Sequence, residues 1–170
     1  SAAPKNAAMT LTELMGRRVL ANPDTIYFSL FGQPVTYAKL WEMSHRHAGG
    51  LAKAGITAGD KVCLIYPTCA EFFYSFFGTL LLGAIPVPLY PTMSPEGMAN
   101  VFRDAEARAV VSIDWFRESV EAAQARAANV RHFLTPWELD TAEPPASLPT
   151  SRPEEIAFIQ YTSGSTGHPR

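Results

Sequence analysis

Cysteine is scarce in this chain, and neither sign of charge dominates it. Only two cysteines occur, Cys63 and Cys69, which are too few for a disulfide scaffold or a tetrahedral zinc site. The four histidines show no metal-ligand spacing, so we expect no metal site. Two reduced thiols indicate a cytoplasmic protein. Because the net charge is −2, no basic surface is expected for a nucleic-acid partner.

Uninterrupted hydrophobic stretches long enough to cross a bilayer are also missing. The first nine residues are small and polar and contain no apolar signal core. Residues 72–89 are mostly apolar, but two glycines and two prolines interrupt them. A helix followed by a buried strand fits this segment better than a membrane-spanning helix. We therefore expect no transmembrane segment.

From residue 10 to residue 161 the sequence alternates between helical and extended patterns. Helices are expected at residues 10–22, 36–54, 69–82, from 94 onward, and 114–127, the last with Asp114 as its N-cap. Strands are expected at residues 25–31, 35–36, 61–66, 84–89, 109–113, 130–134 and 156–161, the first two as a hairpin around residues 32–34. Strands separated by helices of ten or more residues pair in parallel through right-handed crossovers. The predicted fold class is α/β, a layered, largely parallel sheet flanked by helices.

The composition changes after residue 140. Residues 141–153 contain four prolines among small polar residues and no hydrophobic period, which predicts a surface connection. We therefore divide the chain into an N-terminal α/β subdomain at residues 1–140, this Pro-rich connection, and a strand with its following loop at residues 154–170.

The last ten residues have the strongest chemical signal in the chain. Hydroxyl residues, glycines and a cation follow the predicted strand as Thr162, Ser163, Gly164, Ser165, Thr166, Gly167 and Arg170. Glycines let backbone amides approach a phosphate, hydroxyls donate to its oxygens, and arginine adds a charge-assisted contact. We interpret these residues as a phosphate-binding loop. Taken alone, the same composition is also typical of a flexible linker.

The spacing within this loop differs from the commoner phosphate and nucleophile motifs. Two residues separate Gly164 and Gly167, whereas a Walker A loop has four between its glycines. The dinucleotide fingerprint lacks its first glycine. Ser165 has a glycine only one residue before it, unlike the serine of a nucleophile elbow.

Residues 161–169 resemble, nearly residue by residue, the phosphate-loop signature of the adenylate-forming superfamily. This superfamily includes acyl-CoA synthetases, fatty acyl-AMP ligases and the adenylation domains of peptide synthetases. Its members usually have lysine where this chain has Arg170, which keeps the charge but changes the shape of the side chain. Weaker resemblances occur in matching order at residues 35–40, 59–62, 70–72 and 83–91.

The resemblance implies the N-terminal subdomain of an enzyme that joins a carboxylic acid to ATP and passes the acyl group to a thiol. The implied cofactor is ATP with Mg²⁺ in the full-length enzyme, with the Mg²⁺ ligand outside this chain. The implied partners are a fatty acid or other carboxylic acid, and coenzyme A or an acyl carrier protein. By similarity, the loop would hold the polyphosphate. No complete catalytic set is expected within 170 residues, so the isolated chain should be inactive.

Three interpretations remain, and the resemblance ranks them. Residues 159–160 and 86–91 are more similar to fatty-acid-activating members than to amino-acid-activating ones, which favours a fatty-acid ligase. The second interpretation is an adenylation domain for an amino or aryl acid. The third is a non-catalytic α/β module. The length of the acyl chain, the thiol acceptor and the oligomeric state stay open.

Overall fold

The computed structural model describes residue 24, residues 26–30 and residues 33–149. The predicted helix at residues 10–22 and the predicted strand at residues 156–161 lie outside this part of the chain. The first described elements form the predicted hairpin, in which β1 (Ile26–Leu30) pairs antiparallel with β2 (Gln33–Thr36). The sequence placed Gln33 and Pro34 in the turn, whereas both belong to β2. A two-stranded ribbon has only edges, where proline is tolerated because its missing amide is not needed.

The helix α2 (Tyr37–Lys53) begins and ends where its sequence predicts. The side chain of Thr36 caps the first turn by accepting a hydrogen bond from the backbone amide of Lys39 at 3.1 Å. Gly55 follows the last turn with a φ of +95°, a left-handed conformation that glycine adopts without steric cost.

Four parallel strands form the central sheet, in the order β4-β3-β5-β6. They are β3 (Lys61–Ile65), β4 (Ile85–Leu89), β5 (Ala109–Ser112) and β6 (His132–Leu134). In β4 the amide of Ile85 donates to Asp60 on the β3 side at 2.8 Å. The alternate residues Pro86 and Pro88 therefore lack their amides on the side away from β3, where the described sheet needs no donor.

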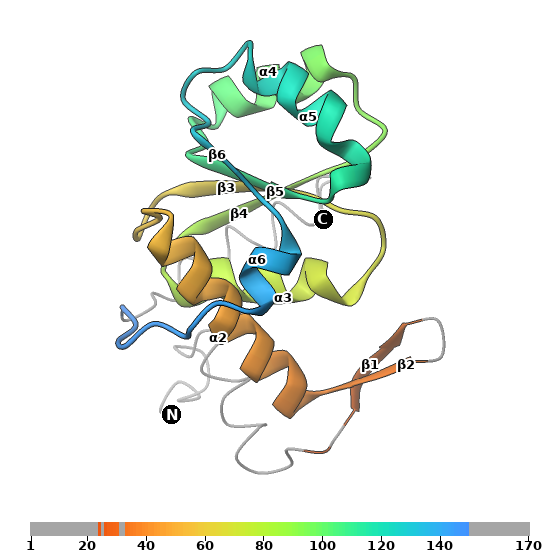
Figure 1. The fold of residues 1–170 in the computed structure, drawn as a ribbon, viewed down its shortest axis with the longest axis vertical. Coiled ribbons are helices and arrows are strands. Elements are labelled where there is room, and N and C mark those ends of the chain that lie inside the picture. Colours follow the sequence, from red (N-terminus) through yellow and green to blue (C-terminus); the bar gives the residue numbers. More distant parts are fainter. Residues whose placement is uncertain (1–23, 25, 31–32, 150–170) are drawn as a thin grey trace, which may run out of the picture.

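Helices cover both faces of this sheet, as Figure 1 shows, which confirms the predicted α/β fold. They are α2 with α3 (Ala70–Leu81) and α6 (Pro136–Asp140) on one face, and α4 (Pro95–Asp104) with α5 (Arg117–Gln124) on the other. Along β3, Val62 and Leu64 pack toward α2, α3 and α6, whereas Cys63 and Ile65 pack toward α4 and α5. The alternation explains why the strand reads as continuously apolar.

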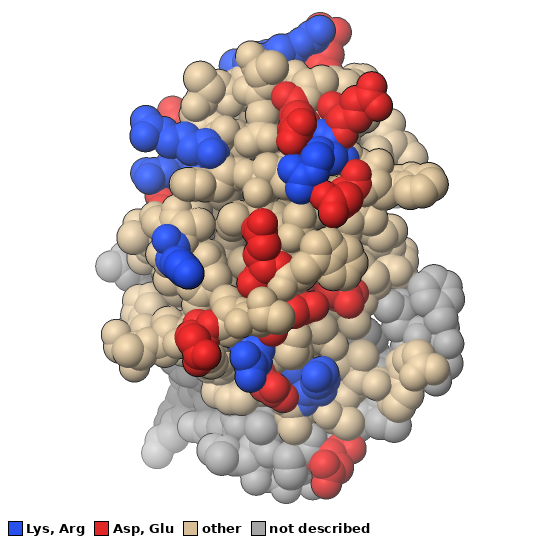
Figure 2. Space-filling model, viewed as in Figure 1, with Lys and Arg blue, Asp and Glu red and all other residues tan. Residues whose placement is uncertain are grey.

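The apolar segment at residues 72–89 forms most of α3 and all of β4, as predicted. Within the described part of the chain, no helix is both long enough and apolar enough to span a bilayer. Charged side chains of both signs are scattered over the face drawn in Figure 2.

Two further local features differ from the expectation. Asp114 does not cap the fifth helix, because a 3₁₀ turn (Asp114–Phe116) comes first and α5 begins only at Arg117. The Asp114 carboxylate accepts a hydrogen bond from Arg117 Nε at 2.8 Å instead of one from a backbone amide of α5. The sequence reading also omitted α6, although Thr135 and Glu138 form a capping box before it and Pro136 occupies its first turn.

Candidate functional site

The seven residues of the predicted phosphate loop, at positions 162–167 and 170, lie outside the described residues and remain a prediction. What the structure describes is the carboxyl edge of the parallel sheet. In open α/β sheets ligands bind at this edge, close to the point where successive connections pass to opposite faces. Here that point lies between the neighbouring strands β3 and β5, because α3 follows β3 on one face of the sheet and α5 follows β5 on the other.

A pocket of about 400 Å³ opens at the carboxyl ends of β3 and β4. Sequence reasoning did not identify it. Its lining consists of apolar, aromatic and uncharged polar residues, namely Tyr66, Pro67, Thr68, Cys69, Phe72, Phe73, Pro88, Leu89, Tyr90 and Pro91. Predominantly apolar walls with a few polar groups are typical of small-molecule pockets.

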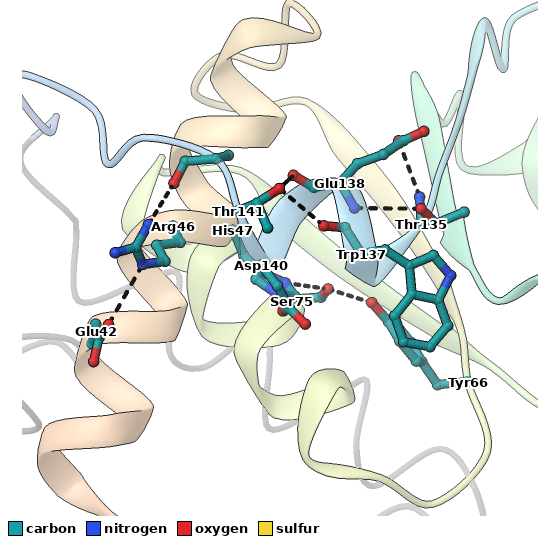
Figure 3. Close-up of polar contacts among 11 residues, drawn as sticks. Glu42, Arg46, His47, Tyr66, Ser75, Thr135, Trp137, Glu138, Asp140 and Thr141 are labelled. Atoms are coloured by element: carbon teal, nitrogen blue, oxygen red, sulfur yellow. Dashed lines mark hydrogen bonds and ion pairs between the residues drawn. The ribbon is translucent and has the colours of Figure 1, made fainter.

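Tyr66, the first residue after β3, is the end of a buried chain of hydrogen bonds (Figure 3). Its hydroxyl lies 2.6 Å from Ser75 Oγ on α3, which in turn lies 2.8 Å from His47 Nδ1 on α2. His47 Nε2 lies 2.6 Å from Asp140 Oδ1 on α6. The side chains of His47 and Ser75 are fully buried, so water does not compete for the contacts that Ser75 makes with His47 and Tyr66. The chain of hydrogen bonds joins α2, α3, α6 and the end of β3.

The donors and acceptors of this network balance when the histidine is neutral. Nε2–H of His47 then donates to Asp140, and Nδ1 accepts from the Ser75 hydroxyl. The hydroxyl of Tyr66 donates to Ser75, and burial keeps it protonated by raising the pKa of Tyr66 above its ordinary value. The four side chains therefore fix one another without leaving a buried donor unused.

The segment after β6 is attached to α2 by further contacts. Arg46 donates to the carbonyl of Ala142 at 3.4 Å and lies 3.5 Å from Glu42 Oε1 on its own helix. Gly49 and Gly50 allow the close approach, since a side chain at either position would meet residues 139–144. These contacts hold the start of the Pro-rich connection, directly after α6, against α2. The sequence analysis found no metal-ligand spacing for His47 and did not predict its pairing with Ser75. The signal that could have indicated this partner is a small polar residue within the apolar helix α3.

The two thiols have different environments, which leads to a prediction about alkaline pH. Burial raises the pKa of Cys63 from 9.0 to about 12, and burial raises that of Cys69 to about 11. A thiol that ionises less readily when folded stabilises the fold fully below pH 9, and this contribution falls as the pH rises toward the folded pKa.

We expect the free energy of unfolding, measured with urea, to fall by about 1 kcal/mol between pH 7.5 and pH 10 because the buried thiol of Cys63 ionises only in the unfolded chain. In the matched variant Cys63→Ala, the free energy of unfolding should fall by about 1 kcal/mol less over the same pH range, whatever its value at pH 7.5. An identical decline in both proteins would contradict the assignment.

Neither thiol forms a disulfide, and no group of three or more His, Cys, Asp or Glu side chains among the described residues could hold a metal ion.

The sequence of the chain is similar to those of known CoA ligases. The long-chain-fatty-acid–CoA ligase FadD13 of Mycobacterium tuberculosis is 30% identical over 144 residues, covering 80% of this chain and 28% of the ligase. The 4-coumarate–CoA ligase of Pinus taeda is 30% identical over 139 residues, covering 75% of this chain and 26% of the ligase. The chain thus spans little more than a quarter of the length of either relative.

A solved structure of another CoA ligase has the same fold. The structure of the anthranilate CoA ligase AuaEII, solved with anthranoyl-AMP, superposes with a TM-score of 0.78 at 18% identity, covering 88% of this chain and 30% of that one. The family described as AMP-binding enzyme matches residues 16–170, which includes the predicted phosphate loop. The chain is a member of the AMP-binding enzyme family and corresponds to the N-terminal region of adenylate-forming enzymes.

Proposed function

We propose that the full-length protein activates a carboxylic acid, most specifically a fatty acid, by forming an acyl-adenylate that a thiol then attacks. The observation that supports this most is the match of residues 16–170 to the AMP-binding enzymes, since it extends through the hydroxyl- and glycine-rich loop. A ligase relative named for fatty acids and another named for 4-coumarate are equally identical to the chain, so fatty acids rank first only through residues 86–91 and 159–160.

In this proposal the loop holds the terminal phosphates of ATP. Amides beside Gly164 and Gly167 and hydroxyls such as those of Ser165 and Thr166 would donate to the phosphate oxygens. Arg170 would offset the charge that develops as pyrophosphate leaves. The chain need supply no general base, because the attacking carboxylate is already ionised at neutral pH. ATP, bound with Mg²⁺, would supply the adenylyl group, since the carboxylate attacks the α-phosphorus and pyrophosphate leaves.

Carboxylate-dependent pyrophosphate exchange by the full-length parent tests the assignment. We expect exchange with octanoate or decanoate, and less with 4-coumarate, benzoate or the free amino acids. Exchange driven only by amino acids would reject the fatty-acid assignment, and exchange driven only by aryl acids would favour the second interpretation. We also expect no exchange from the isolated 170-residue chain, and detectable exchange by it would contradict that expectation.

Variants of Arg170 in the parent test the role of the loop. Removing a charge-assisted contact to phosphate costs roughly 1.5–3 kcal/mol, so Arg170→Ala should lower the exchange rate constant by about tenfold or more. Arg170→Lys is the matched control, because lysine is the residue that the family usually has there, and it should keep most of the activity. Equal rates for all three proteins would show that the residue does not contact the nucleotide.

A further inference from the structure

Three cationic residues lie side by side at the amino ends of the central strands. Lys61 begins β3, and Arg108 and Arg131 directly precede β5 and β6. The amide of Arg108 donates to the carbonyl of Lys61 at 2.9 Å, and the amide of Arg131 donates to the carbonyl of Arg108 at 3.1 Å. Neighbouring strands are about 4.8 Å apart, so these three residues, which we call the cationic row, span roughly 10 Å.

The side chains of the cationic row leave the sheet on one face. Val62 pairs with Ala109 and Ala109 pairs with His132, so the residues just before these three also stand opposite one another. Val62 and Ala109 pack toward α2, α3 and α6. Because side chains alternate along a strand, the row lies on the side of α4 and α5. Like charges opposite one another in neighbouring strands repel, and anionic groups bound to the row would relieve this repulsion.

Little negative charge within the described chain offsets the row. Asp60 Oδ1 lies 4.0 Å from Arg108 Nη1, but Oδ2 of the same carboxylate accepts from the amide and the hydroxyl of Thr57 at 2.8 and 3.1 Å. Lys61 and Arg131 form no ion pair with any acidic side chain that the structure describes. The side chain of Arg108 is 53% exposed and Arg131 is exposed as well, so a partner can reach them.

The charged residues around the row do not change this picture. Arg103, in the last turn of α4, donates to the carbonyl of Arg126 and to Asn100 Oδ1, both at 2.6 Å. Cations at helix carboxyl ends complement the helix dipole, which accounts for Arg103 locally. Asp104 and Glu106, in the turn before β5, are exposed and form no ion pair with the row. The net charge of −2 for the whole chain therefore conceals a row that stays positive.

We propose that the cationic row is a docking surface for an acidic helix of a partner protein. Carboxylate residues four positions apart on a helix have Cβ atoms about 5–6 Å apart, which is close to the spacing between strands. A helix that lies across the strands can therefore offer one carboxylate to each cation. The planar guanidinium of arginine suits this role because it binds a carboxylate through two parallel hydrogen bonds. Such docking would not depend on which acid the parent activates.

Two other kinds of anionic partner fit this surface less well. A small anion is held by donors that converge on one point, whereas the row is spread over three strands. A membrane surface is bound most firmly when apolar side chains accompany the cations. The exposed rings of Tyr90, Trp115 and Trp137 instead follow the carboxyl ends of β4, β5 and β6. The cations of the row and these rings therefore occupy opposite edges of the sheet.

Fluorescence anisotropy of a labelled acidic peptide tests this surface on the full-length parent. The peptide has about 20 residues, long enough to form a helix, with glutamate at every fourth position of an alanine-rich sequence. We expect saturable binding that weakens at least about tenfold when NaCl rises from about 50 to about 500 mM, because salt screens exposed charges. Arg108→Gln with Arg131→Gln should weaken binding about tenfold, and Arg108→Glu with Arg131→Glu should abolish it.

The control variant removes two positive charges from other places. It carries Lys39→Gln on α2 and Arg117→Gln on α5, where Asp114 and Glu121 already pair with the arginine. Its affinity should stay within about twofold of that of the unaltered parent. A second peptide of the same charge has a central proline, which interrupts a helix, and should bind at least about threefold more weakly. Circular dichroism and the urea midpoint report whether each variant is folded.

The outcomes separate the alternatives. No binding of the first peptide, or equal losses in the row and control variants, would overturn the inference. Equal binding of the proline-containing peptide would also overturn it, because the match of spacings requires a helix. Binding of phosphatidylserine vesicles or tripolyphosphate but not of the peptide, lost in the Arg108 and Arg131 variants, would assign the row to a lipid surface or a polyphosphate instead. Peptide binding by a parent without pyrophosphate exchange would leave the docking surface standing and reject the proposed reaction.

Discussion

Replacing His47 by leucine is expected to destabilise the chain by about 3 kcal/mol, because it breaks the buried hydrogen-bond chain in the middle. Ser75 would lose its acceptor, and Asp140 would lose the imidazole that lies 2.6 Å from its carboxylate. Asp140 is 26% exposed, so water can partly replace its lost partner and the effect should stay at the lower end of that for a buried pair. Urea unfolding monitored by circular dichroism measures the change.

A matched control lies two residues away on the same helix. His45 is only partly buried, and its Nδ1 lies 2.7 Å from the carbonyl of Trp41 one turn earlier. His45→Leu should cost no more than about 1 kcal/mol, since it removes one partly buried hydrogen bond and a ring contact with Trp41 that leucine can replace by packing on the indole. If both variants lost the same stability, the network would have no special role. Asp140→Asn should fall between them, because the amide can still accept from Nε2–H.

Gly78→Ala is expected to destabilise the chain by about 2 kcal/mol, although alanine normally stabilises a helix interior by 0.5–1 kcal/mol relative to glycine. Gly78 lies on α3 where this helix packs against α2. A Cβ there would lie 2.8 Å from the Ser44 carbonyl oxygen and 2.9 Å from the Ala48 amide nitrogen. Because both are backbone atoms, the two helices would have to separate. Their separation would also lengthen the contact between Ser75 and His47.

Gly97→Ala in α4 is the control for helix propensity. Its Cβ would meet only side-chain atoms, with Ser94 Oγ at 3.3 Å and Met93 Cε at 3.5 Å. We expect a change between neutral and a stabilisation of roughly 0.5 kcal/mol. Thermal unfolding of both variants decides the matter, because opposite signs are predicted for the same chemical change. A stabilised Gly78→Ala protein would show that α2 and α3 do not pack as closely as the structure has them.

The sheet and its covering helices could be predicted because each follows from local rules. Apolar runs such as Lys61–Ile65 lack a polar face, and intervening helices of suitable length permit only parallel pairing. Thr36 and Ser94 show their capping role in the sequence itself. One error occurred where two partners compete for the same side chain. Asp114 had two partners within reach, the backbone of a helix and Arg117, and sequence alone does not rank them.

Less of the described site could be predicted. The pocket depends on how the segments after β3 and β4 meet, and no local pattern gives the distance between Phe72 and Leu89. His47 and Asp140 are 93 residues apart, so their pairing follows only from the docking of α6 on α2. Tyr66 could be placed at the end of a strand, but its hydroxyl partner on α3 required the register of that helix against the sheet. The phosphate loop was identified by resemblance, and its geometry stays a prediction.

The attachment of α6 to α2 has a consequence for biosynthesis. A ribosome adds roughly 5–20 residues per second. His47 is therefore synthesised about 5–20 s before Asp140, the residue that accepts its hydrogen bond. During that interval α2 and α3 can pair, yet the apolar side of α2 that later receives Leu139 stays open to water and to other nascent chains. Chaperone binding to stalled chains that end before residue 136 should therefore exceed binding to chains that extend well past residue 145.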